Sequence, residues 1–243
     1  YASDPNSPAQ DAALDSLTQL AEFNPDIVDP LMTVLEDELE SQIREDESPH
    51  ITLRYITQLG PKAARAAPRI RELLKREELE IQDEAVAALI CLLGADAEDA
   101  LIILRDDLQN RDGYSWYNLR TGTRFAAPAV PILREYLKRR TELGELQNVD
   151  SEVFYTAKAL GPDGVELAPY LVDVLGGYIS NPTISDALVN MGSSVVPLLA
   201  DALEDKMSSP ERHGLVLQTL ARFDRDAAPA LDSVLLHVES PHP

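Results

Sequence analysis

The stretch Leu59-Gly-Pro-Lys-Ala-Ala-Arg-Ala-Ala-Pro-Arg-Ile-Arg-Glu-Leu-Leu74 contains two signals that recur along the whole chain. Gly60 follows an apolar run, and glycine in that place supplies the left-handed residue that ends a helix. Pro68 opens the pattern Pro-x-apolar-x-x-apolar, in which Ile70 and Leu73 are the apolar positions. Proline fits the first turn of a helix, where its missing N–H is not needed. The stretch therefore predicts the end of one helix, a turn and the start of a second helix.

The proline pattern recurs at regular intervals. Its anchors are six prolines and one aspartate: Pro30, Pro68, Asp99, Pro131, Pro169, Pro197 and Pro229. Neighbouring anchors are 28 to 38 residues apart, which is the length of a helical hairpin. The helix-ending position holds Gly60, Gly94, Gly161 and Gly192 in four copies, and Asn24 and Asp224 in the first and last copies. Each unit is predicted to consist of helix A, a tight turn and helix B.

Two copies carry a second proline directly after the glycine, at Pro61 and Pro162. We expect helix B to begin with an extra, kinked turn in these two copies. The alternative is an ordinary helical bundle with randomly placed prolines. It is disfavoured because six spaced prolines share the same downstream apolar pattern.

The composition agrees with an all-α fold. The chain has 243 residues, of which 44% are hydrophobic and only 5% aromatic, and leucine, alanine and valine are plentiful. These values exclude a disordered chain and disfavour an all-β fold. No apolar run approaches the roughly 20 residues that a membrane helix needs. The single cysteine, Cys91, cannot form an internal disulfide or a zinc site of several thiols, and its apolar surroundings predict a buried structural thiol.

The repeats resemble those of bacterial HEAT-repeat proteins, including the HEAT-like repeats of phycobilisome lyases. The resemblance is carried by residues 59–74 and by Leu160-Gly-Pro-Asp-Gly-Val-Glu-Leu-Ala-Pro-Tyr-Leu-Val-Asp-Val-Leu175, and it covers about residues 11–239. It departs from the family at Asp99 and in the poorly formed A-helix of the fourth unit. The resemblance implies an α-solenoid, a right-handed superhelix of about seven HEAT-like hairpins. Most proteins of this kind are protein-binding scaffolds.

This reading divides the chain into one repeat domain and two tails. Residues 11–239 are expected to form a single domain, with 1–10 as a linker or processed N-terminal tail and 240–243 as a C-terminal tail. The first unit follows polar residues, and the last carries His237 and a polar tail. Terminal units of a repeat stack need a polar outer face, so both are expected to act as caps.

Motifs of catalysis are scarce. The histidines, His50, His213, His237 and His242, form neither His-x-x-x-His nor His-Glu-x-x-His spacing. There is no His-Glu dipeptide, as used by HEAT-repeat metal enzymes of the deoxyhypusine hydroxylase type, no Gly-x-Ser-x-Gly elbow and no phosphate-binding loop. We therefore expect that the chain is not an enzyme and that it binds no metal and no cofactor. The alternative is an accessory enzyme, such as a bilin-lyase-like or other ligand-handling HEAT protein.

The charge is strongly negative and unevenly distributed. With 21 Lys and Arg against 42 Asp and Glu, the net charge is −21, which argues against a nucleic-acid partner. Residues 1–43 contain ten acids and no base, residues 44–140 contain sixteen of each, and residues 141–243 contain sixteen acids and five bases. The middle of the chain therefore differs from both flanks.

Two basic B-helices flank an acidic one in this middle segment. The basic residues are Lys62, Arg65, Arg69, Arg71, Lys75 and Arg76 in the second, and Arg134, Lys138, Arg139 and Arg140 in the fourth. The acids of the third are Asp96, Glu98, Asp99, Asp106 and Asp107. If B-helices line the concave face, as the resemblance implies, these charges form either salt bridges between helices or a charge-patterned docking groove.

The repeat pattern lapses between Arg111 and Arg124. Three aromatic residues, Tyr114, Trp116 and Tyr117, lie there beside arginines, and Trp, Tyr and Arg are enriched at binding hot spots. The alternative is a shortened A-helix whose aromatic residues fill a gap in the core. The predicted partner-binding residues are Arg65, Arg69, Tyr114, Trp116, Tyr117, Arg120, Arg124 and Lys138.

The acidic stretch 36–47 lacks the spacing of a calcium loop, which favours a solvated helix end. Taken together, the sequence predicts a non-catalytic scaffold that binds a protein or peptide on its concave B-helix surface. We expect no nucleic-acid partner, no membrane insertion in this segment, and a monomer or part of a larger chain. The compartment stays open between the bacterial cytoplasm and export after removal of a signal peptide.

Overall fold

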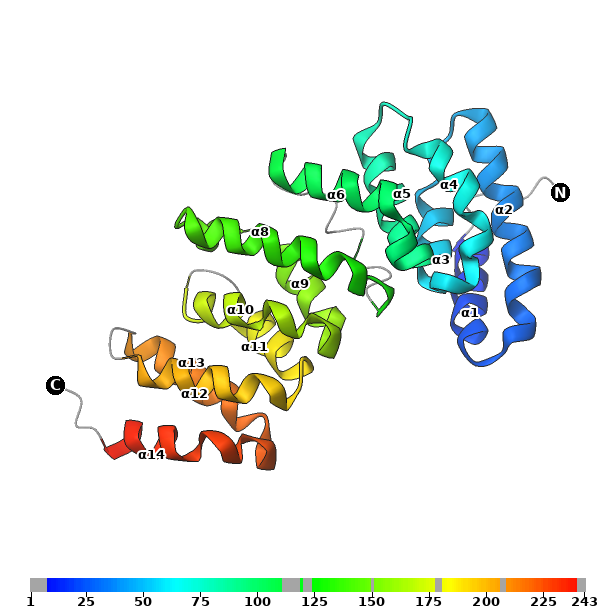
Figure 1. Ribbon diagram of the computed structural model, residues 1–243. Helices are drawn as coiled ribbons and strands as arrows, with labels where there is room; N and C mark the ends of the chain where they lie inside the picture. Colours follow the sequence, from blue (N-terminus) through cyan, green and yellow to red (C-terminus); the bar gives the residue numbers. More distant parts are fainter. Residues whose placement is uncertain are drawn as a thin grey trace. The chain divides into compact units, whose positions relative to one another are not determined.

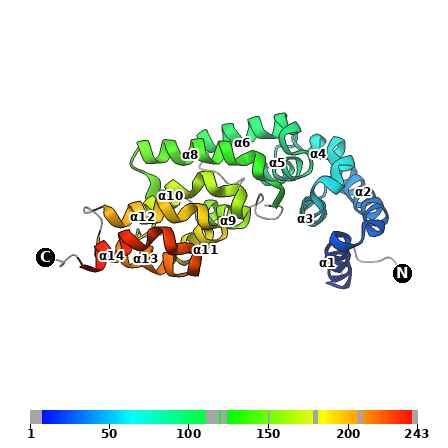
Figure 2. The same ribbon diagram turned by 60° about the horizontal axis from the view of Figure 1, so that its bottom comes forward.

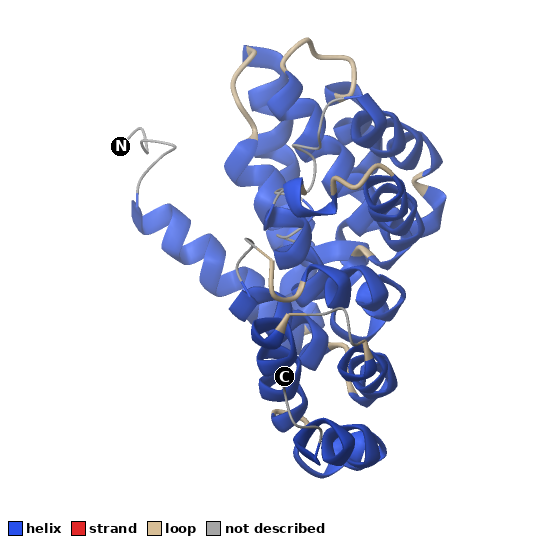
Figure 3. Cartoon of the chain, turned by 90° about the vertical axis from the view of Figure 1, so that its left-hand side faces the viewer, coloured by secondary structure: helices blue, strands red, loops and turns tan. Residues whose placement is uncertain are grey.

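The computed structural model describes residues 8–110, 119, 124–149, 151–177, 181–205 and 209–239. Every regular element of these residues is an α-helix or a 3-10 helix, and none is a strand (Figure 3). This confirms the all-α class. The helices group into two compact units, Tyr1–Pro128 and Ala129–Pro243. The single repeat domain over residues 11–239 stays a prediction.

The first unit consists of helices that pack in successive pairs (Figure 1). Its elements are α1 (Pro8–Phe23), η1 (Pro25–Ile27), α2 (Val28–Glu45), α3 (His50–Leu59), η2 (Gly60–Ala66), α4 (Ala67–Leu73), α5 (Leu79–Leu93), η3 (Gly94–Asp96) and α6 (Glu98–Asn110). Helix α1 packs against α3 and α3 against α5, while α2 packs against α1, α3 and α4. The core between them includes the fully buried side chains of Met32, Tyr55, Ile56 and Ile70.

The second unit repeats this arrangement in two rows of helices. Its elements are α8 (Val130–Glu142), η6 (Leu146–Asn148), α9 (Ser151–Leu160), η7 (Gly161–Leu167), α10 (Ala168–Val174), α11 (Asn181–Asn190), η8 (Ser193–Val195), α12 (Val196–Glu204), α13 (Pro210–Ala221), η9 (Asp224–Ala230) and α14 (Leu231–Glu239). The short η5 (Ala127–Ala129) precedes α8. Helices α8, α10, α12 and α14 lie side by side in order (Figures 1 and 2), and α9, α11 and α13 form the other row.

The anchor residues lie where the sequence predicts them, with one exception. Pro68, Pro131, Pro169 and Pro197 are each the second residue of a B-helix, as is Asp99 in α6, and Pro30 is the third residue of α2. Pro229 differs because it lies inside the 3-10 helix η9, two residues before α14 begins. The extra turns expected after Pro61 and Pro162 are confirmed as the seven-residue 3-10 helices η2 and η7.

The helix-ending glycines have positive φ angles, as the sequence predicts, but Gly60, Gly94 and Gly192 differ from a left-handed helical residue in ψ. Gly60 has φ 59° and ψ −135°, and Gly94 has φ 61° and ψ −126°. This is the mirror image of extended backbone, the conformation of the first central residue of a type II′ turn, which glycine dominates. Glycine is therefore required more strictly here than an ordinary left-handed cap would require it.

The first and last copies, which hold Asn24 and Asp224 in place of the glycine, behave differently from each other. Asp224 adopts a positive φ of 48° and so takes the place of the glycine. Asn24 does not, because its backbone is extended and its side chain accepts a hydrogen bond from the Asp26 N–H at 3.1 Å. It is therefore the N-cap of η1.

Cys91 is a core residue of α5, as predicted. Its side chain is buried, and burial raises the pKa of the thiol to about 12. The thiol is therefore protonated at neutral pH and is not a nucleophile. In the part of the chain that the structure describes, no single helix is long and apolar enough to span a membrane. One pair, Pro182–Asn190 with Ser193–Glu204, passes the test of length and composition only together, across a bend of 110°.

Candidate interaction surfaces

The predicted partner-binding residues fall into three groups. Arg65 and Arg69 lie on η2 and α4 of the first unit, and Arg124 lies near the end of that unit. Lys138 lies on α8 of the second unit. Tyr114, Trp116, Tyr117 and Arg120 lie outside the described residues, as does most of the segment between Arg111 and Arg124.

Arg65 and Arg69 face the acidic side chains of α2. Arg65 is paired with Asp29 at 3.2 Å and with Glu36 at 3.0 Å. Arg69 lies 3.5 Å from Glu40 and 3.2 Å from Glu72 of its own helix. The side chains of Arg65 and Arg69 remain 43% and 48% exposed, so both ion pairs are open to water. The first basic ridge is thus joined to the B-helix that precedes it.

The same ridge is joined to the B-helix that follows it. Arg71 of α4 donates from Nε to Asp99 of α6 at 2.8 Å, and this hydrogen bond holds the pKa of Asp99 below its ordinary value. In the second unit, Arg134 of α8 pairs with Glu166 of η7 at 2.7 Å. Charges of neighbouring hairpins therefore meet in salt bridges in these two places, as in the first of the two interpretations that the sequence left open, and the docking groove stays a prediction.

Arg124 contacts two A-helices of the first unit, α1 and α3. Its guanidinium is paired with Glu22 of α1, donates to the carbonyl of Gln58 at 3.2 Å, and lies 4.7 Å from the centre of the Phe125 ring. Lys138 has a different environment, 3.9 Å from Glu142 on its own helix and 67% exposed. Arg124 is thus tied into its unit, whereas Lys138 is a solvated surface residue.

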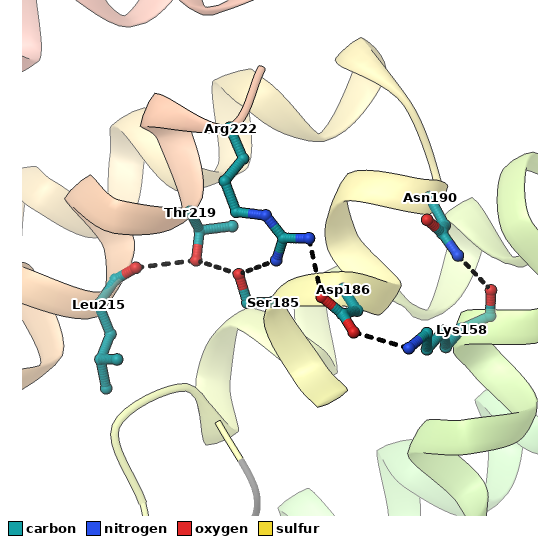
Figure 4. A network of polar contacts seen from close by, with 7 residues as sticks. All are labelled: Lys158, Ser185, Asp186, Asn190, Leu215, Thr219 and Arg222. Carbon is teal, nitrogen blue, oxygen red and sulfur yellow. Dashed lines mark hydrogen bonds and ion pairs between the residues drawn. The ribbon is translucent and has the colours of Figure 1, made fainter. Parts of the chain in front are cut away.

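A polar network on α9, α11 and α13 was missed by the sequence reasoning (Figure 4). Asp186 of α11 is paired with Lys158 of α9 at 2.6 Å and with Arg222, just after α13, at 2.7 Å. Arg222 also donates to the Ser185 hydroxyl at 2.9 Å, and that hydroxyl lies 3.0 Å from Thr219. Three consecutive A-helices are therefore joined through one carboxylate.

One signal of this network is present in the sequence. Lys158 and Asp186 each lie eleven residues before an anchor proline, at Pro169 and Pro197, so they occupy the same repeat position with opposite charge. Residues at equal positions of stacked repeats are neighbours. Arg222 lies at a different repeat position, and its pairing with Asp186 follows only from the packing of α13 on α11.

We expect Asp186→Asn to lower the free energy of unfolding by about 1–2 kcal/mol at pH 7, because two cations lose their shared carboxylate. The hydrogen bonds from Lys158 and Arg222 lower the pKa of Asp186 from its ordinary 3.8. A lowered pKa stabilises the fold above the ordinary value, and this contribution is lost as the pH falls through the lowered one. The free energies of unfolding of wild type and variant, measured in urea, should therefore become equal at acidic pH.

Asp201→Asn is the matched control for this prediction, because Asp201 is an exposed carboxylate on the neighbouring α12. It should leave stability at pH 7 unchanged. Equal stability of wild type and Asp186→Asn at pH 7 would contradict a stabilising role of the network.

His50 and His213 have structural surroundings. His50 Nδ1 lies 2.6 Å from Glu84 of α5, and burial raises the pKa of that carboxyl. His213 is buried, and its Nε2 lies 3.1 Å from the carbonyl of Asp205. In the described residues no group of three or more His, Cys, Asp and Glu side chains is placed to hold a metal ion.

The acidic stretch 36–47 lies along the C-terminal half of α2, which ends at Glu45 and is capped by Asp46 with φ 59°. Most of its side chains are exposed or half-buried, while Leu39 is buried. This confirms the predicted solvated helix end. Binding of calcium there is untested.

An apolar groove lies on the hairpin formed by α13, η9 and α14. It has a volume of about 420 Å³, and its lining includes Leu217, Leu220, Leu231 and Val234, with Asp224 and Arg225 at the polar part. Helix α14 exposes Leu231, Leu235 and Leu236. The expectation that the last hairpin has a polar outer face is therefore wrong, because its apolar positions have no covering helix among the described residues.

Comparison with known proteins adds no function. No family model matches the chain, and no curated protein sequence matches it. The chain is similar to a solved structure of an engineered protein at 19% sequence identity and a TM-score of 0.39, covering 99% of this chain and 67% of that chain. A TM-score this low carries no argument about fold or activity, and the chain is assigned to no family.

Proposed function

We propose that the chain is an α-solenoid of about seven HEAT-like hairpins, and that it acts as a non-catalytic scaffold binding a protein or peptide on its B-helix surface. Support for the repeat architecture comes from the helix starts at six of the seven anchor positions. It comes also from the order of packing, in which α8, α10, α12 and α14 follow one another in one row. The HEAT-like assignment itself rests on the sequence resemblance.

The observation that carries the binding function is the exposed charge pattern on α2 and α4. Glu40 of α2 and Arg69 of α4 are 57% and 48% exposed, and they lie 3.5 Å apart. Exposed ion pairs of this kind contribute only about 0–1 kcal/mol to stability. A partner can therefore replace one member of such a pair with its own charged group at little cost in folding energy.

A charged surface of this kind selects its partner by charge pattern. Acids of α2 lie beside bases of η2 and α4, and Arg71 then meets Asp99 of α6. Complementary charges across an interface guide encounter and fix the register of the partner more than they raise affinity. The surface is suited to a polar protein or peptide with the opposite pattern, bound by a monomer or by part of a larger chain. No observation favours the bilin-lyase-like alternative.

The test is a charge reversal on this surface. We expect Arg69→Glu to reduce recovery of a specific partner from an extract of the native cells by about tenfold or more, because a like charge then meets the partner's acid. The variant should fold, since Arg69 is half exposed. Tagged whole chain, quantitative mass spectrometry and circular dichroism provide the measurements.

Asp15→Lys serves as the control because Asp15 is exposed on α1, an A-helix, and its carboxylate accepts a hydrogen bond from Gln19 of the same helix. It changes the net charge by the same amount in magnitude and should leave partner recovery unchanged. A partner set that is identical for wild type and Arg69→Glu would refute binding through this surface.

A further inference from the structure

One repeat position, the second residue after the anchor, is buried in five of the seven units and half-buried in the third, at Leu101. The second residue after the anchor proline is fully buried in five units, at Met32, Ile70, Leu133, Leu171 and Leu199. The equivalent residue of the last unit, Leu231, is 56% exposed. Helix α12, which carries Leu199, packs against η9 and α14 of the following hairpin. Leu231 therefore occupies a position that elsewhere is covered by helices.

A second position of the same helix face behaves in the same way. The sixth residue after the anchor is buried at Leu137, Leu175 and Leu203, with exposed fractions of 0%, 1% and 5%, but Leu235 is 47% exposed. Leu231 and Leu235 are four residues apart, so they lie on one face of α14. Leu231 also lines the groove of about 420 Å³ whose lining includes Leu217 and Leu220 of α13. An apolar groove of this kind suits the apolar face of an amphipathic helix.

The charge at this face indicates what kind of helix would cover it. The third residue after the anchor pairs with the next hairpin in two units, where Arg71 contacts Asp99 and Arg134 contacts Glu166. In the last unit this position is Asp232, an exposed carboxylate that makes no ion pair among the described residues. A helix in the same register would meet Asp232 with a lysine or arginine.

The segment that contributes to the groove is acidic. Asp224 and Arg225 line the groove, and Asp226 and the exposed Asp232 follow in the same segment, so that its acids outnumber its base by three to one. The wider segment 141–243 contains sixteen acids and five bases. Complementary potentials favour encounter with a cationic helix and disfavour an anionic one.

We propose that the groove formed by α13, η9 and α14 binds a basic amphipathic helix of a partner protein. The helix lays a leucine-rich stripe on Leu231, Leu235 and Leu217, and its flanking Lys or Arg side chains pair with Asp232 and the other acids of this segment. This surface is separate from the charged face of α2 and α4. The inference therefore stands or falls independently of the proposed scaffold function.

The competing occupant is a second copy of the chain. Helix α1 also exposes an apolar stripe, formed by Leu17, Leu20 and Phe23, with Phe23 84% exposed. Residues 1–43, however, contain ten acids and no base. Pairing this stripe with the groove would place like charges against each other, which costs affinity. Charge therefore favours a basic partner helix.

The test uses a synthetic helix as the probe. A fluorescent peptide of about 18 residues, with leucines at i, i+3, i+4 and i+7 and lysines on both flanks, is titrated with the whole chain in fluorescence anisotropy at physiological salt. A scrambled peptide of identical composition controls for attraction to an acidic protein, and a third peptide has every lysine replaced by glutamate. We expect the amphipathic basic peptide to bind at least about tenfold more tightly than either control.

Three variants connect this binding to the groove. Leu231→Ser should lower the affinity for the basic peptide about tenfold or more. Asp232→Lys should lower the affinity for the basic peptide and raise the affinity for the acidic one. Leu143→Ser is the matched control, because Leu143 follows α8 and is 59% exposed but lies outside the groove. Arg69→Glu should also leave the peptide affinity unchanged, which separates this result from the test of the scaffold function.

Other outcomes overturn the proposal. Equal binding of the scrambled peptide would mean attraction by net charge alone, and full binding by Leu231→Ser would place the site elsewhere. Dimers in light scattering that dissociate in Leu231→Ser would identify a second copy as the occupant. A longer form of the polypeptide whose own helices bury Leu231 and prevent peptide binding would identify an intramolecular occupant.

Discussion

Gly60→Ala is expected to lower the free energy of unfolding of the first unit by about 3–5 kcal/mol, as the sum of backbone strain and steric overlap. The backbone of Gly60 has φ 59° and ψ −135°, a conformation that alanine avoids. In addition, an added Cβ would overlap the ring of Phe125, which closes over the glycine. Urea unfolding followed by circular dichroism measures the loss.

Gly94→Ala separates the two causes. Gly94 has nearly the same backbone conformation, with φ 61° and ψ −126°, but the nearest atom to an added Cβ is Pro128 Cγ at 3.6 Å, an ordinary contact. We expect Gly94→Ala to lower the free energy of unfolding through backbone strain alone, by about 1–3 kcal/mol. Equal losses in the two variants would show that the Phe125 ring moves aside without cost. A smaller loss in Gly60→Ala than in Gly94→Ala would contradict the prediction, because the two backbones have nearly the same conformation.

Leu199→Ala is expected to cost about 3–4 kcal/mol, whereas Leu231→Ala at the same repeat position should cost less than about 1 kcal/mol. Leu199 is fully buried between hairpins, so its truncation leaves a cavity, but Leu231 is 56% exposed and leaves none. Both residues are leucines in α-helices, and both lie two residues after the anchor proline. The difference between the urea midpoints of the two variants therefore measures how much the covering hairpin contributes to stability.

Similar losses in the two leucine variants would show that Leu231 is covered in solution. Light scattering of both proteins at the same concentration would then distinguish self-association from cover by the chain itself. If Leu231→Ala is neutral and Leu199→Ala is not, the open face exists in the free protein, which is the condition for binding a helix there.

Local signals predict much of this fold because they act within a few residues. A proline, which lacks an N–H, is favoured in the first turn of a helix, and a glycine with positive φ ends one, so the turn from Gly60 to Pro68 follows from the residues alone. The exceptions are also local. Asn24 uses its side chain as an N-cap, and Pro229 remains in a 3-10 helix, and both choices depend on the competition between closely similar backbone geometries.

The candidate surfaces were less predictable. Arg65 and Arg69 were identified as basic surface residues, yet their partners on α2 lie about 30 positions earlier in the sequence, and only the packing of α2 on α4 brings them together. Asp186 carries no distinguishing motif, because the chain has 42 acids. Its role follows from Lys158 and Arg222, which belong to two other helices.

The sequence by itself determined where most B-helices begin and most A-helices end, the number and spacing of the repeat anchors, and the uneven distribution of charge. These properties depend on backbone conformation and composition, which each residue carries with it. Tertiary structure alone decided which ion pairs form and which apolar positions are covered, because burial belongs to a residue and its neighbours together. Leu199 and Leu231 hold the same place in the repeat, and only the helices packed against the first of them bury it.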